Sequence, residues 1–341
     1  MGVNLRGLTN PVKISLNHLS GRIVAVDAHN ALYQFLSIIR GEAGDHLVDK
    51  EGRVTSHLSG LFYRNIKLLE LDIKPIYILD GTPSLLKTKE IQRRRTVKQK
   101  ANNLYKEAIA RGDIILAKKY AQSTTYLKNY MITDTKRMLD LMGIPWIEAK
   151  SEGEATAAYL TNIGVATDTV SQDFDALLFG AKRLLRNVTI SRKRKTLGKN
   201  NYTDISPEEI VLEKTLDNLG VTREQLVDIA ILIGTDYNPK GFSQIGPAKA
   251  LKNVKKYGCL EKINSIYEEL QKIDFIAIRK IFLHPEVTKP EKNVVWNQPN
   301  REKIIDFLCY EHSFSKDRIN KSLDKLENIK VKKSETLEKW F

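Results

Sequence analysis

Two short apolar runs that each end in an aspartate restrict the fold of this chain more than any other feature. Residues 21–27 and 74–80 read as buried strands with Asp27 and Asp80 at their carboxyl ends. Further helices are expected at residues 31–39, 56–71, 133–142 and 154–162, and further strands at residues 145–148 and 168–172. This alternation predicts an α/β fold with a mostly parallel central sheet flanked by helices. Sites in such sheets form beyond the carboxyl ends of the strands, so we expect Asp27 and Asp80 to be neighbours.

Acidic residues recur at strand ends and tight turns through the first two thirds of the chain. Seven of them stand out: Asp27, Asp80, Glu152, Glu154, Asp173, Asp175 and Asp236. If the fold gathers them, two carboxylates about 5 Å apart repel by roughly 3 kcal/mol at an effective dielectric constant of about 20. Magnesium ions would relieve this repulsion, since they prefer oxygen ligands and keep several waters. Two such ions support phosphodiester hydrolysis, so the pattern indicates a metal-dependent nuclease.

Parts of this acidic set also have interpretations that need no metal. Ser151, followed three residues later by Glu154, fits a capping box at the start of a helix. Asp173 and Asp175 would face one cation together if an extended strand continued through them, but an Asp-rich turn is an equal alternative. Asp236 fits a plain loop as well as a site. The residues alone leave these alternatives open.

The charge of the chain favours a polyanionic partner. It has 55 basic and 41 acidic side chains and a formal net charge of +14, which suits nucleic acid, although a solvated basic surface is the alternative. Cys259 and Cys309 stand in no CxxC or Cys/His cluster, so we expect neither a disulfide framework nor a zinc site. No signal peptide and no apolar run of membrane-spanning length is evident. We therefore expect a soluble intracellular protein.

Six motifs carry a resemblance to a known family. They are Met1-Gly2-Val3, Val26-Asp27-Ala28 with Tyr33-Gln34-Phe35, Leu79-Asp80-Gly81-Thr82-Pro83, Ser151-Glu152-Gly153-Glu154-Ala155, Ser171-Gln172-Asp173-Phe174-Asp175 and Ile233-Gly234-Thr235-Asp236-Tyr237. In this order they resemble the motifs of the flap structure-specific endonucleases of the 5′-nuclease (XPG/Rad2-like) superfamily. The resemblance covers nearly the whole chain, whose length is similar to that of the archaeal members.

The resemblance implies a fold and an activity. The implied fold is a PIN-like 5′-nuclease core with a helical arch and a helix–hairpin–helix DNA-binding region. The implied activity is cleavage of 5′ flaps of branched DNA in replication (Okazaki fragment maturation) and repair, with a 5′–3′ exonuclease side activity. It implies two Mg²⁺ ions, replaceable by Mn²⁺, at the seven acids. Alternatives are a bubble-cutting or mainly exonucleolytic relative and a non-catalytic DNA-junction binder or clamp adaptor. A non-catalytic binder or adaptor would be expected to have lost some of the seven acids.

The resemblance also implies how the chain is divided. The expected regions are 1–84 and 131–240 for the nuclease, 85–130 for the arch, 225–265 for the helix–hairpin–helix (overlapping), 266–328 for a C-terminal helical part and 329–341 for a flexible tail. A monomer is expected, in the cytoplasm with the nucleoid if the source is archaeal and in the nucleus if it is eukaryotic.

Basic residues near the expected arch have implied roles on the substrate. Residues 86–100 carry seven basic side chains and one acid, which suits either a solvated face or a phosphate-binding surface. By spacing from Asp80, the resemblance places Lys87 and Arg94 over the scissile phosphate, where they would stabilise developing charge. Tyr33 resembles an aromatic residue that stacks on a base, and a core tyrosine is the alternative. The tyrosines of the expected arch either stack on bases or hold the arch helices together, and these are Tyr105, Tyr120, Tyr126 and Tyr130.

Two further segments are expected to contact duplex DNA. Gly241 to Lys249 looks like a helix–hairpin–helix in which Gly246 frees the turn and Pro247 starts the second helix. The amides at that helix start would bind a phosphate, and the family implies a possible K⁺ there. Residues 181–199 have eight basic side chains and no acid, which suits a DNA backbone contact or a solvated loop. The DNA-binding residues expected from the motifs are Gly2, Tyr33, Gly241, Gly246 and Lys249.

The end of the chain resembles a box that binds a sliding clamp (proliferating cell nuclear antigen). Leu337, Trp340 and Phe341 have i, i+3, i+4 spacing, so one helical turn would present all three to an apolar groove. Ser334 occupies the place of the usual glutamine and removes an amide hydrogen-bonding group. An amphipathic end that folds back on its own protein is the alternative.

Overall fold

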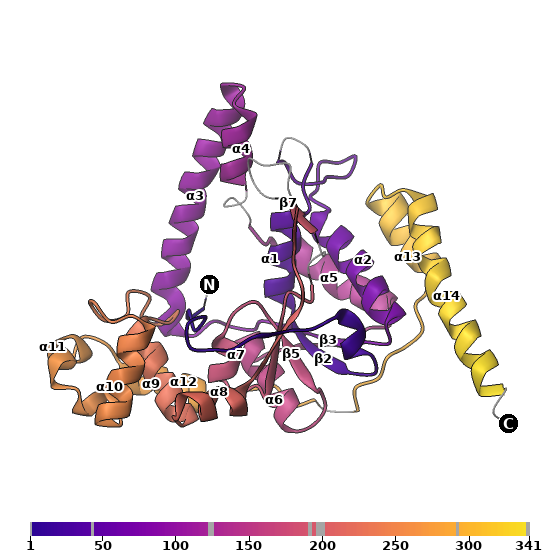
Figure 1. Cartoon of the computed structure of the whole chain (residues 1–341). Helices are drawn as coiled ribbons and strands as arrows, with labels where there is room; N and C mark the ends of the chain where they lie inside the picture. Colours follow the sequence, from indigo (N-terminus) through magenta and orange to yellow (C-terminus); the bar gives the residue numbers. More distant parts are fainter. Residues whose placement is uncertain are drawn as a thin grey trace.

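A seven-stranded sheet forms the centre of the molecule (Figure 1). The computed structural model describes residues 2–41, 44–121, 126–189, 193–195, 202–290 and 293–338. The strand order is β1-β9-β6-β5-β2-β3-β4. The bounds are β1 Val12–Lys13, β2 Ile23–Asp27, β3 Lys74–Leu79, β4 Trp146–Glu148, β5 Asp168–Val170, β6 Arg183–Arg186 and β9 Glu208–Val211. A separate two-stranded sheet pairs β7 Lys193–Lys195 with β8 Tyr202–Asp204.

The predicted α/β fold is confirmed. Strands β4, β3, β2, β5 and β6 are parallel, so their carboxyl ends lie at one edge of the sheet, while β9 is antiparallel to both β6 and β1. The sequence pattern found β2, β3 and β4 within two residues of their bounds but missed β6 and β9. The expected strand at residues 168–172 ends earlier, at Val170.

Helices cover both faces of the sheet. Their bounds are α1 Ala28–Ile38, α2 Ser56–Glu70, α3 Thr88–Ala110, α4 Ile114–Ala121, α5 Asn129–Leu141, α6 Gly153–Asn162, α7 Asp175–Leu178, α8 Leu212–Leu219, α9 Arg223–Ile233, α10 Pro247–Tyr257, α11 Tyr267–Leu270, α12 Phe275–Leu283, α13 Arg301–Ile305 and α14 Lys316–Glu338. Successive side chains of a strand point to opposite faces, so Val24 and Val26 of β2 pack in the core with α1 and α2, whereas Ala25 packs against α6. No helix within the described ranges combines the length and apolar character that crossing a bilayer requires.

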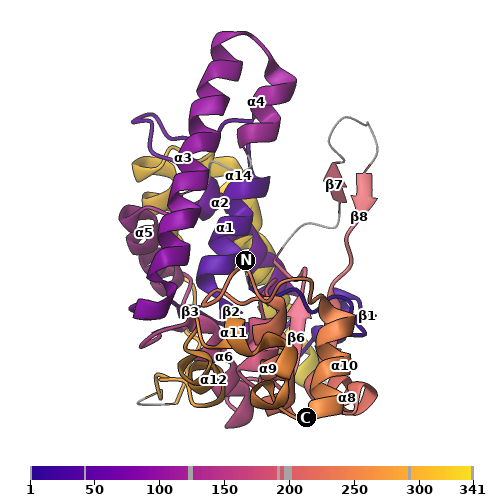
Figure 2. The ribbon, with the colours of Figure 1, turned by 90° about the vertical axis from the view of Figure 1, so that its left-hand side faces the viewer.

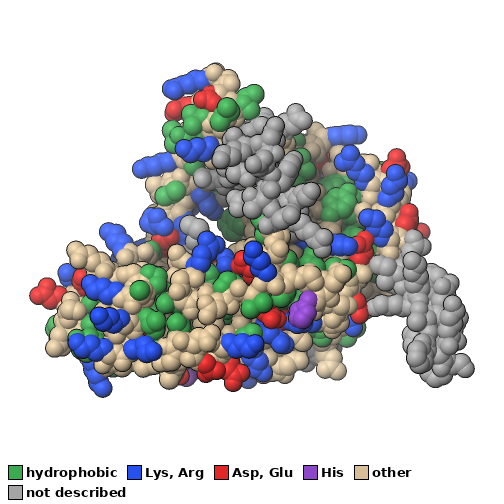
Figure 3. All heavy atoms as spheres, viewed as in Figure 1, with side chains coloured by type: hydrophobic (Ala, Val, Ile, Leu, Met, Phe, Trp, Pro, Cys, Tyr) green, Lys and Arg blue, Asp and Glu red, His purple; other side chains and the backbone are tan. Residues whose placement is uncertain are grey.

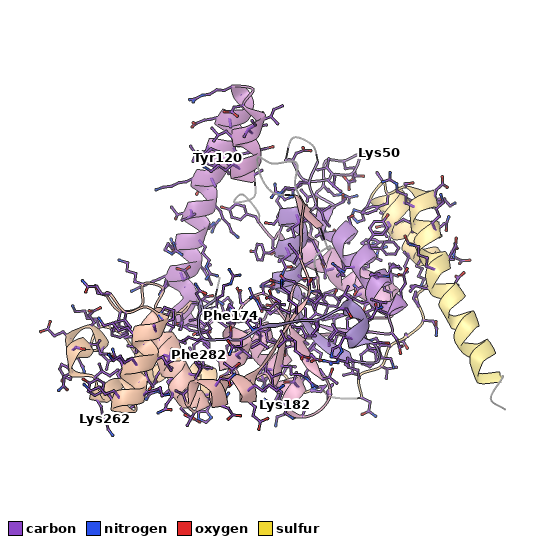
Figure 4. All side chains as sticks on the ribbon, in the orientation of Figure 1. Lys50, Tyr120, Phe174, Lys182, Lys262 and Phe282 are labelled. Atoms are coloured by element: carbon purple, nitrogen blue, oxygen red, sulfur yellow. The ribbon has the colours of Figure 1, made fainter. Side chains whose placement is uncertain are left out.

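Two lobes lie on either side of the sheet. Helices α9 to α12 pack around α7 in one core, and α13 and α14 close the core of α1, α2 and α5 on the other side (Figure 1). Phe282 of α12 lies where the first lobe meets the sheet layer (Figure 4), and its ring meets the Tyr237 ring edge-on at a centroid distance of 5.5 Å.

A helical hairpin projects above the sheet. Helices α3 and α4 run side by side away from the body, as Figures 1 and 2 show. The turn between them contains Gly112, whose φ of 72° favours glycine. Ala101 and Ala108 of α3 and Ala117 and Ala121 of α4 are buried, which lets the two helices approach closely. The hairpin occupies most of the segment that we expected to form an arch.

Candidate active site

Asp27 lies at the centre of the site because it ends β2, the middle one of the five parallel strands. It occupies the N-cap of α1, and its Oδ1 accepts a hydrogen bond from the backbone N–H of Asn30 at 2.9 Å. The side chain is buried, and burial raises the pKa of Asp27 well above its usual value, with the nearby charges of Asp80 and Asp173 adding to the effect. Asp27 and Asp80 are therefore neighbours, as the strand pattern predicts.

Asp80 follows β3 and is held from two sides. Its Oδ1 accepts from the backbone N–H of Gly153 at 2.7 Å, and its own backbone N–H donates to His29 Nδ1 at 3.0 Å. A nitrogen that accepts this bond carries no proton, so the His29 ring has its proton on Nε2. A hollow of about 300 Å³ opens beside Asp80, and Lys136 and Glu148 are among the residues that line it. The acid is fixed at the wall of an accessible space.

The capping-box interpretation of residues 151–154 is wrong. Helix α6 begins at Gly153 with Glu152 as its N-cap residue, and no side chain of its own segment caps it. The carboxylate of Asp80 takes that role from another strand end. Glu154 instead accepts a hydrogen bond from Ser171 Oγ at 2.6 Å, and this hydroxyl oxygen of Ser171 also lies 3.4 Å from Asp27 Oδ2. Glu154 therefore belongs to the acidic site.

The extended backbone considered for residues 171–175 does not occur. Strand β5 ends at Val170 and Asp175 begins α7, so Asp173 and Asp175 do not alternate along one strand. They remain electrostatic neighbours: burial raises the pKa of Asp175 to about 7, and the charges of Asp236 and Asp173 contribute. The backbone N–H of Val3 donates to Asp175 Oδ1 at 2.7 Å.

The N-terminal residues press directly against this acid. A Cβ atom on Gly2 would lie 2.3 Å from Asp175 Oδ1, closer than any side chain can come. Only glycine fits at position 2 while Asp175 keeps its place. Gly2, which we expected at the DNA interface, thus borders the acidic site.

Electrostatic coupling joins the buried acids into one site. Burial raises the pKa of Glu154 well above its usual value, and the charges of Asp27, Asp175 and Asp173 raise it further. Uncompensated negative charge of this kind fits divalent cations. Among the residues that the structure describes, no three carboxylate, imidazole or thiol groups enclose a single ion directly. Carboxylate oxygens are the ligands that Mg²⁺ prefers, and several acids can bind this ion through water, so the donor set suits Mg²⁺.

Two basic side chains from the base of the hairpin reach the acids. Lys87 Nζ lies 2.6 Å from Glu152 Oε2 and 3.2 Å from Asp236 Oδ2, and Arg94 also pairs with Asp236. Burial by itself would lower the pKa of Lys87, but the two carboxylates raise it well above its usual value. Glu90 accepts from Arg94 Nε at 2.7 Å and so directs its guanidinium group toward Asp236. Lys87 and Arg94 are thus fixed cations at the edge of the site.

Tyr33 lies at the surface beside the hairpin. It is 37 % exposed, so the core alternative is wrong, and Lys98 Nζ of α3 lies 4.3 Å from the centre of its ring. Tyr126 donates its hydroxyl to the carbonyl oxygen of Arg95 at 3.0 Å. This contact favours the interpretation in which Tyr126 ties the hairpin to the chain that follows it.

The predicted helix–hairpin–helix consists of α9, the loop after it and α10. Pro247 occupies the first turn of α10, as expected. Gly246 has φ −92°, a value open to any residue, so the turn does not depend on its freedom. Gly241 fills that role instead, with φ 57° and a position where a Cβ atom would lie 2.2 Å from the carbonyl oxygen of Ile233. Basic side chains gather on the lobe that carries α10 (Figure 3), and the exposed lysines on α10 are Lys249, Lys252, Lys255 and Lys256.

The sequence-based site residues near the chain end are placed only in part. Ser334 and Leu337 lie in α14, and Trp340 and Phe341 lie outside the described residues. The basic segment around residue 190 is described only at residues 181–189 and in the backbone of β7. The two cysteines, Cys259 and Cys309, are free.

Several residues that hold the acids were missed in the sequence. His29, Asn30, Ser171 and Tyr237 each make a hydrogen bond to one of the acidic residues or lie within hydrogen-bonding distance of its carboxylate. Each stands within three residues of one of the seven acids, which is the signal that could have found them.

Comparison with known proteins agrees with this geometry. Residues 1–101 match the XPG N-terminal domain and residues 143–236 match the XPG I-region. The fold is similar to the flap endonuclease-1 of Methanococcus jannaschii, with a TM-score of 0.76, 40 % identity and coverage of 97 % of this chain and 100 % of that one. The catalytic core of Rad2 in complex with DNA shares the fold, with a TM-score of 0.69 at 23 % identity over 95 % of this chain and 100 % of that one. Fold and site together define an XPG-type nuclease.

Relatives of similar length identify the family to which the chain belongs within the class of XPG-type nucleases. Flap endonuclease 1 of Nitrosopumilus maritimus is 52 % identical over 341 residues, which is 100 % of both chains. Flap endonuclease 1 of Pyrococcus abyssi is 48 % identical over 343 residues, which covers 100 % of this chain and 98 % of that protein. The chain belongs to the flap endonuclease 1 family.

Proposed function

We propose that this protein is a magnesium-dependent endonuclease that cleaves 5′ flaps of branched DNA near the junction of single and double strand. The observation that carries the proposal is the convergence of acids from β2, β3, α6, α7 and the loop after α9 beside the cations of Lys87 and Arg94. Membership in the flap endonuclease 1 family supports this substrate. Replication and repair, including Okazaki fragment maturation, are the processes that produce such flaps.

The seven acids would hold two Mg²⁺ ions, for which Mn²⁺ could substitute. These are Asp27, Asp80, Glu152, Glu154, Asp173, Asp175 and Asp236. When bound, such ions supply Lewis-acid chemistry that activates water and neutralises the leaving oxygen. The hydrogen bonds from Asn30, Gly153, Ser171 and Val3 orient the carboxylates before any ligand arrives. The chain thus fixes the ligands in advance, which removes reorganisation from the reaction step.

Lys87 and Arg94 would act on the scissile phosphate. Both side chains pair with Asp236 in the free protein. If Asp236 bound a cation, its negative charge would be compensated, and Lys87 and Arg94 could then turn to the phosphate. Arg94 can contact two phosphate oxygens at once, whereas Lys87 offers a single point charge. Their role is to hold the phosphate and to stabilise the charge that develops on it.

Selection of a junction would depend on shape. The projecting hairpin would pass the 5′ strand beside the site, and Tyr33, with an exposed ring, would stack on a base next to the cut. The amides at the start of α10, with Lys249 nearby, would bind a duplex phosphate, and K⁺ could assist there. Such contacts read the backbone and the bend of the junction rather than its sequence.

Cleavage of defined oligonucleotides tests this proposal. With Mg²⁺, a double-flap substrate should be cut near the junction, leaving a 5′-phosphate and a 3′-hydroxyl, and linear duplex and bubble substrates should be cut far more slowly. Asp173→Ala should lose cleavage while still binding the flap. Equal rates on all three substrates would reject flap specificity. Unchanged turnover by Asp173→Ala would reject the metal role of this acid, and a wild-type protein that binds without cutting would indicate a junction binder.

We also propose a partner and a location for the enzyme. The box formed by Ser334, Leu337, Trp340 and Phe341 would bind a sliding clamp, and the enzyme would act as a monomer where DNA is replicated. That place is the cytoplasm in an archaeal cell and the nucleus in a eukaryotic one.

A further inference from the structure

Asn30, in the first turn of α1, contacts the segment that carries Asp173 of the acidic site. Its Oδ1 accepts from the backbone N–H of Gln172 at 3.1 Å and from Gln34 Nε2 at 2.6 Å. Its Nδ2 donates to Asp173 Oδ2 at 3.4 Å. One amide thus meets both the carboxylate and the backbone of the segment that carries Asp173.

The direction of these hydrogen bonds is fixed by chemistry. The backbone N–H of Gln172 can only donate, so it must face Asn30 Oδ1, and Asn30 Nδ2 is therefore turned toward Asp173. Gln34 lies one turn further along α1, and its Oε1 accepts a hydrogen bond from Thr189 Oγ1 at 2.8 Å. Because Asn30 Oδ1 can only accept, Gln34 must turn Nε2 toward it, which leaves Gln34 Oε1 to accept from the Thr189 hydroxyl. Each amide in the series is held in one orientation by its neighbour.

The series begins at a buried position just beyond the sheet. Thr189 is 4 % exposed and follows β6 by three residues. Thr189 lies within the basic segment of residues 181–199, and residues 192–195, which begin three positions after it, carry four basic side chains. The hydrogen bonds therefore run from the basic segment, through α1, to the acidic site.

We propose that Thr189, Gln34 and Asn30 form a positioning relay that holds Asp173 in the orientation required for cation binding. The relay rests on the proposed function, since it serves the cation site of that reaction. None of the three residues is among the proposed cation ligands or the proposed phosphate-binding residues. A neutral N–H donor on Oδ2 restrains the carboxylate without adding charge to a crowded acidic site. Groups that orient metal ligands from outside typically change metal affinity about 10–100-fold when they are removed.

Variants that remove the hydrogen bonds at either end of the series test the relay. Asn30→Ala removes all three side-chain hydrogen bonds but keeps the backbone N–H that donates to Asp27. Thr189→Val has the same shape as threonine and removes only the hydroxyl at the far end. Mn²⁺ binding without DNA, followed by the electron paramagnetic resonance signal of the free ion, is the measurement. We expect about 10-fold weaker binding for Asn30→Ala and about 3-fold weaker binding for Thr189→Val.

The double variant separates a relay from two independent effects. If Thr189 acts through Asn30, Thr189→Val should cause no further loss in the Asn30→Ala background. Thr135→Val is the matched control, because Thr135 is also buried and its hydroxyl donates only within α5, to the carbonyl oxygen of Met131 at 2.7 Å. It should bind Mn²⁺ like the wild type. Melting temperatures of all variants, measured without cations, report any general loss of stability.

The outcomes distinguish the relay from the proposed function. Unchanged Mn²⁺ affinity in Asn30→Ala and Thr189→Val, with a wild-type protein that binds the ion and cuts flaps, overturns the relay alone. Additive losses, or an equal loss in Thr135→Val, overturn it as well. A wild-type protein that neither binds Mn²⁺ nor cuts overturns the proposed function and the relay that depends on it. A loss in the two relay variants without additivity supports the relay.

Discussion

Single residues in the site show how negative charge is held in place in the absence of ligands. Asp27, Glu154 and Asp175 have raised pKa values because they are buried beside one another, whereas Asp236 meets the cations of Lys87 and Arg94. Backbone and hydroxyl donors fix the buried carboxylates. Keeping these carboxylates ionised in the folded protein therefore costs free energy, and bound cations would remove that cost.

The cation of Lys87 gives the first prediction at this scale. Lys87→Ala should slow single-turnover cleavage by about 100-fold or more, since a fixed charge on the developing transition state is lost. Flap binding, measured in Ca²⁺, should change only slightly because many phosphate contacts remain. Lys89→Ala is a suitable control, since Lys89 is an exposed lysine of the same segment and no salt bridge is formed by it in the described structure. A variant that loses binding but keeps its chemical rate would contradict the assignment.

The raised pKa of Asp175 gives a prediction on stability. The unfolded chain loses this proton at about pH 4, whereas the folded protein, without cations, keeps it to about pH 7. The folded state thus binds more protons in between, and its free energy of unfolding should fall as pH rises from about 4 to about 7, by at most about 1.4 kcal/mol per pH unit. Asp175→Asn can still accept from Val3 and lacks this contribution.

Urea denaturation in chelator at pH 4 and pH 8 is the measurement. The stability of Asp175→Asn relative to the wild type should be greater at pH 8 than at pH 4. The same difference at both pH values would show that the carboxyl does not titrate in this range. Added Mg²⁺ should stabilise the wild type at pH 8 more than the variant.

At the scale of elements, α3 and α14 extend from the body in different ways. Helix α3 starts at the site with Lys87 and Arg94 and continues into the projecting hairpin, so its position and the position of the two cations are linked. Helix α14 begins in the core through Ile319 and Leu323 and extends to Glu338, away from the acidic site (Figure 1). The chain end can therefore engage a partner without changing the site.

Removing the chain end tests this separation. Deletion of residues 337–341 should leave basal flap cleavage within about 2-fold of the wild type but abolish stimulation by a sliding clamp, because the apolar contacts of one helical turn are lost. Ser334→Gln restores the usual amide and should tighten clamp binding, measured by calorimetry. Equal stimulation of the deleted and complete chains would show that the clamp binds elsewhere.

At the scale of the whole molecule, two cores on either side of the sheet hold the site between them. An ion pair joins two helices of the lobe formed by α9 to α12: Asp228 of α9, 3 % exposed, lies 2.8 Å from Arg279 of α12, whose side chain is 23 % exposed. Arg279 also pairs with the more exposed Glu261. Removing one partner of a buried pair leaves an uncompensated charge, which typically costs about 3–5 kcal/mol.

This pair gives a prediction for the stability of the fold. Arg279→Met should lower the free energy of unfolding by about 3 kcal/mol, because Asp228 then stays buried without its partner. Glu261→Gln should cost less than about 1 kcal/mol, since that contact is exposed. Chemical denaturation of both variants provides the comparison. Similar losses for the two would mean that the buried carboxylate finds another partner.

The sequence predicted the fold class because its strongest signals are local. The apolar runs that form β2 and β3, the aspartates at their ends and the helical pattern of α1 and α2 are each visible within a short stretch of sequence. Strands β6 and β9 were missed, since four-residue strands are short and β9 gains its place only by pairing antiparallel to β6. The capping box considered as an alternative for Ser151 and Glu154 does not form, because a distant carboxylate, Asp80, caps α6 instead.

What the sequence determined by itself is that Asp27 and Asp80 lie at strand ends, since burial of a strand and the turn after it are encoded within a few residues. Only the tertiary structure decided how the acids of the site are held: Asp175 by the N-terminal Val3, Glu154 by Ser171, Asp80 by His29 and Gly153. Such contacts join segments up to 172 residues apart. They depend on how the strands are ordered in the sheet, a property that no local pattern contains.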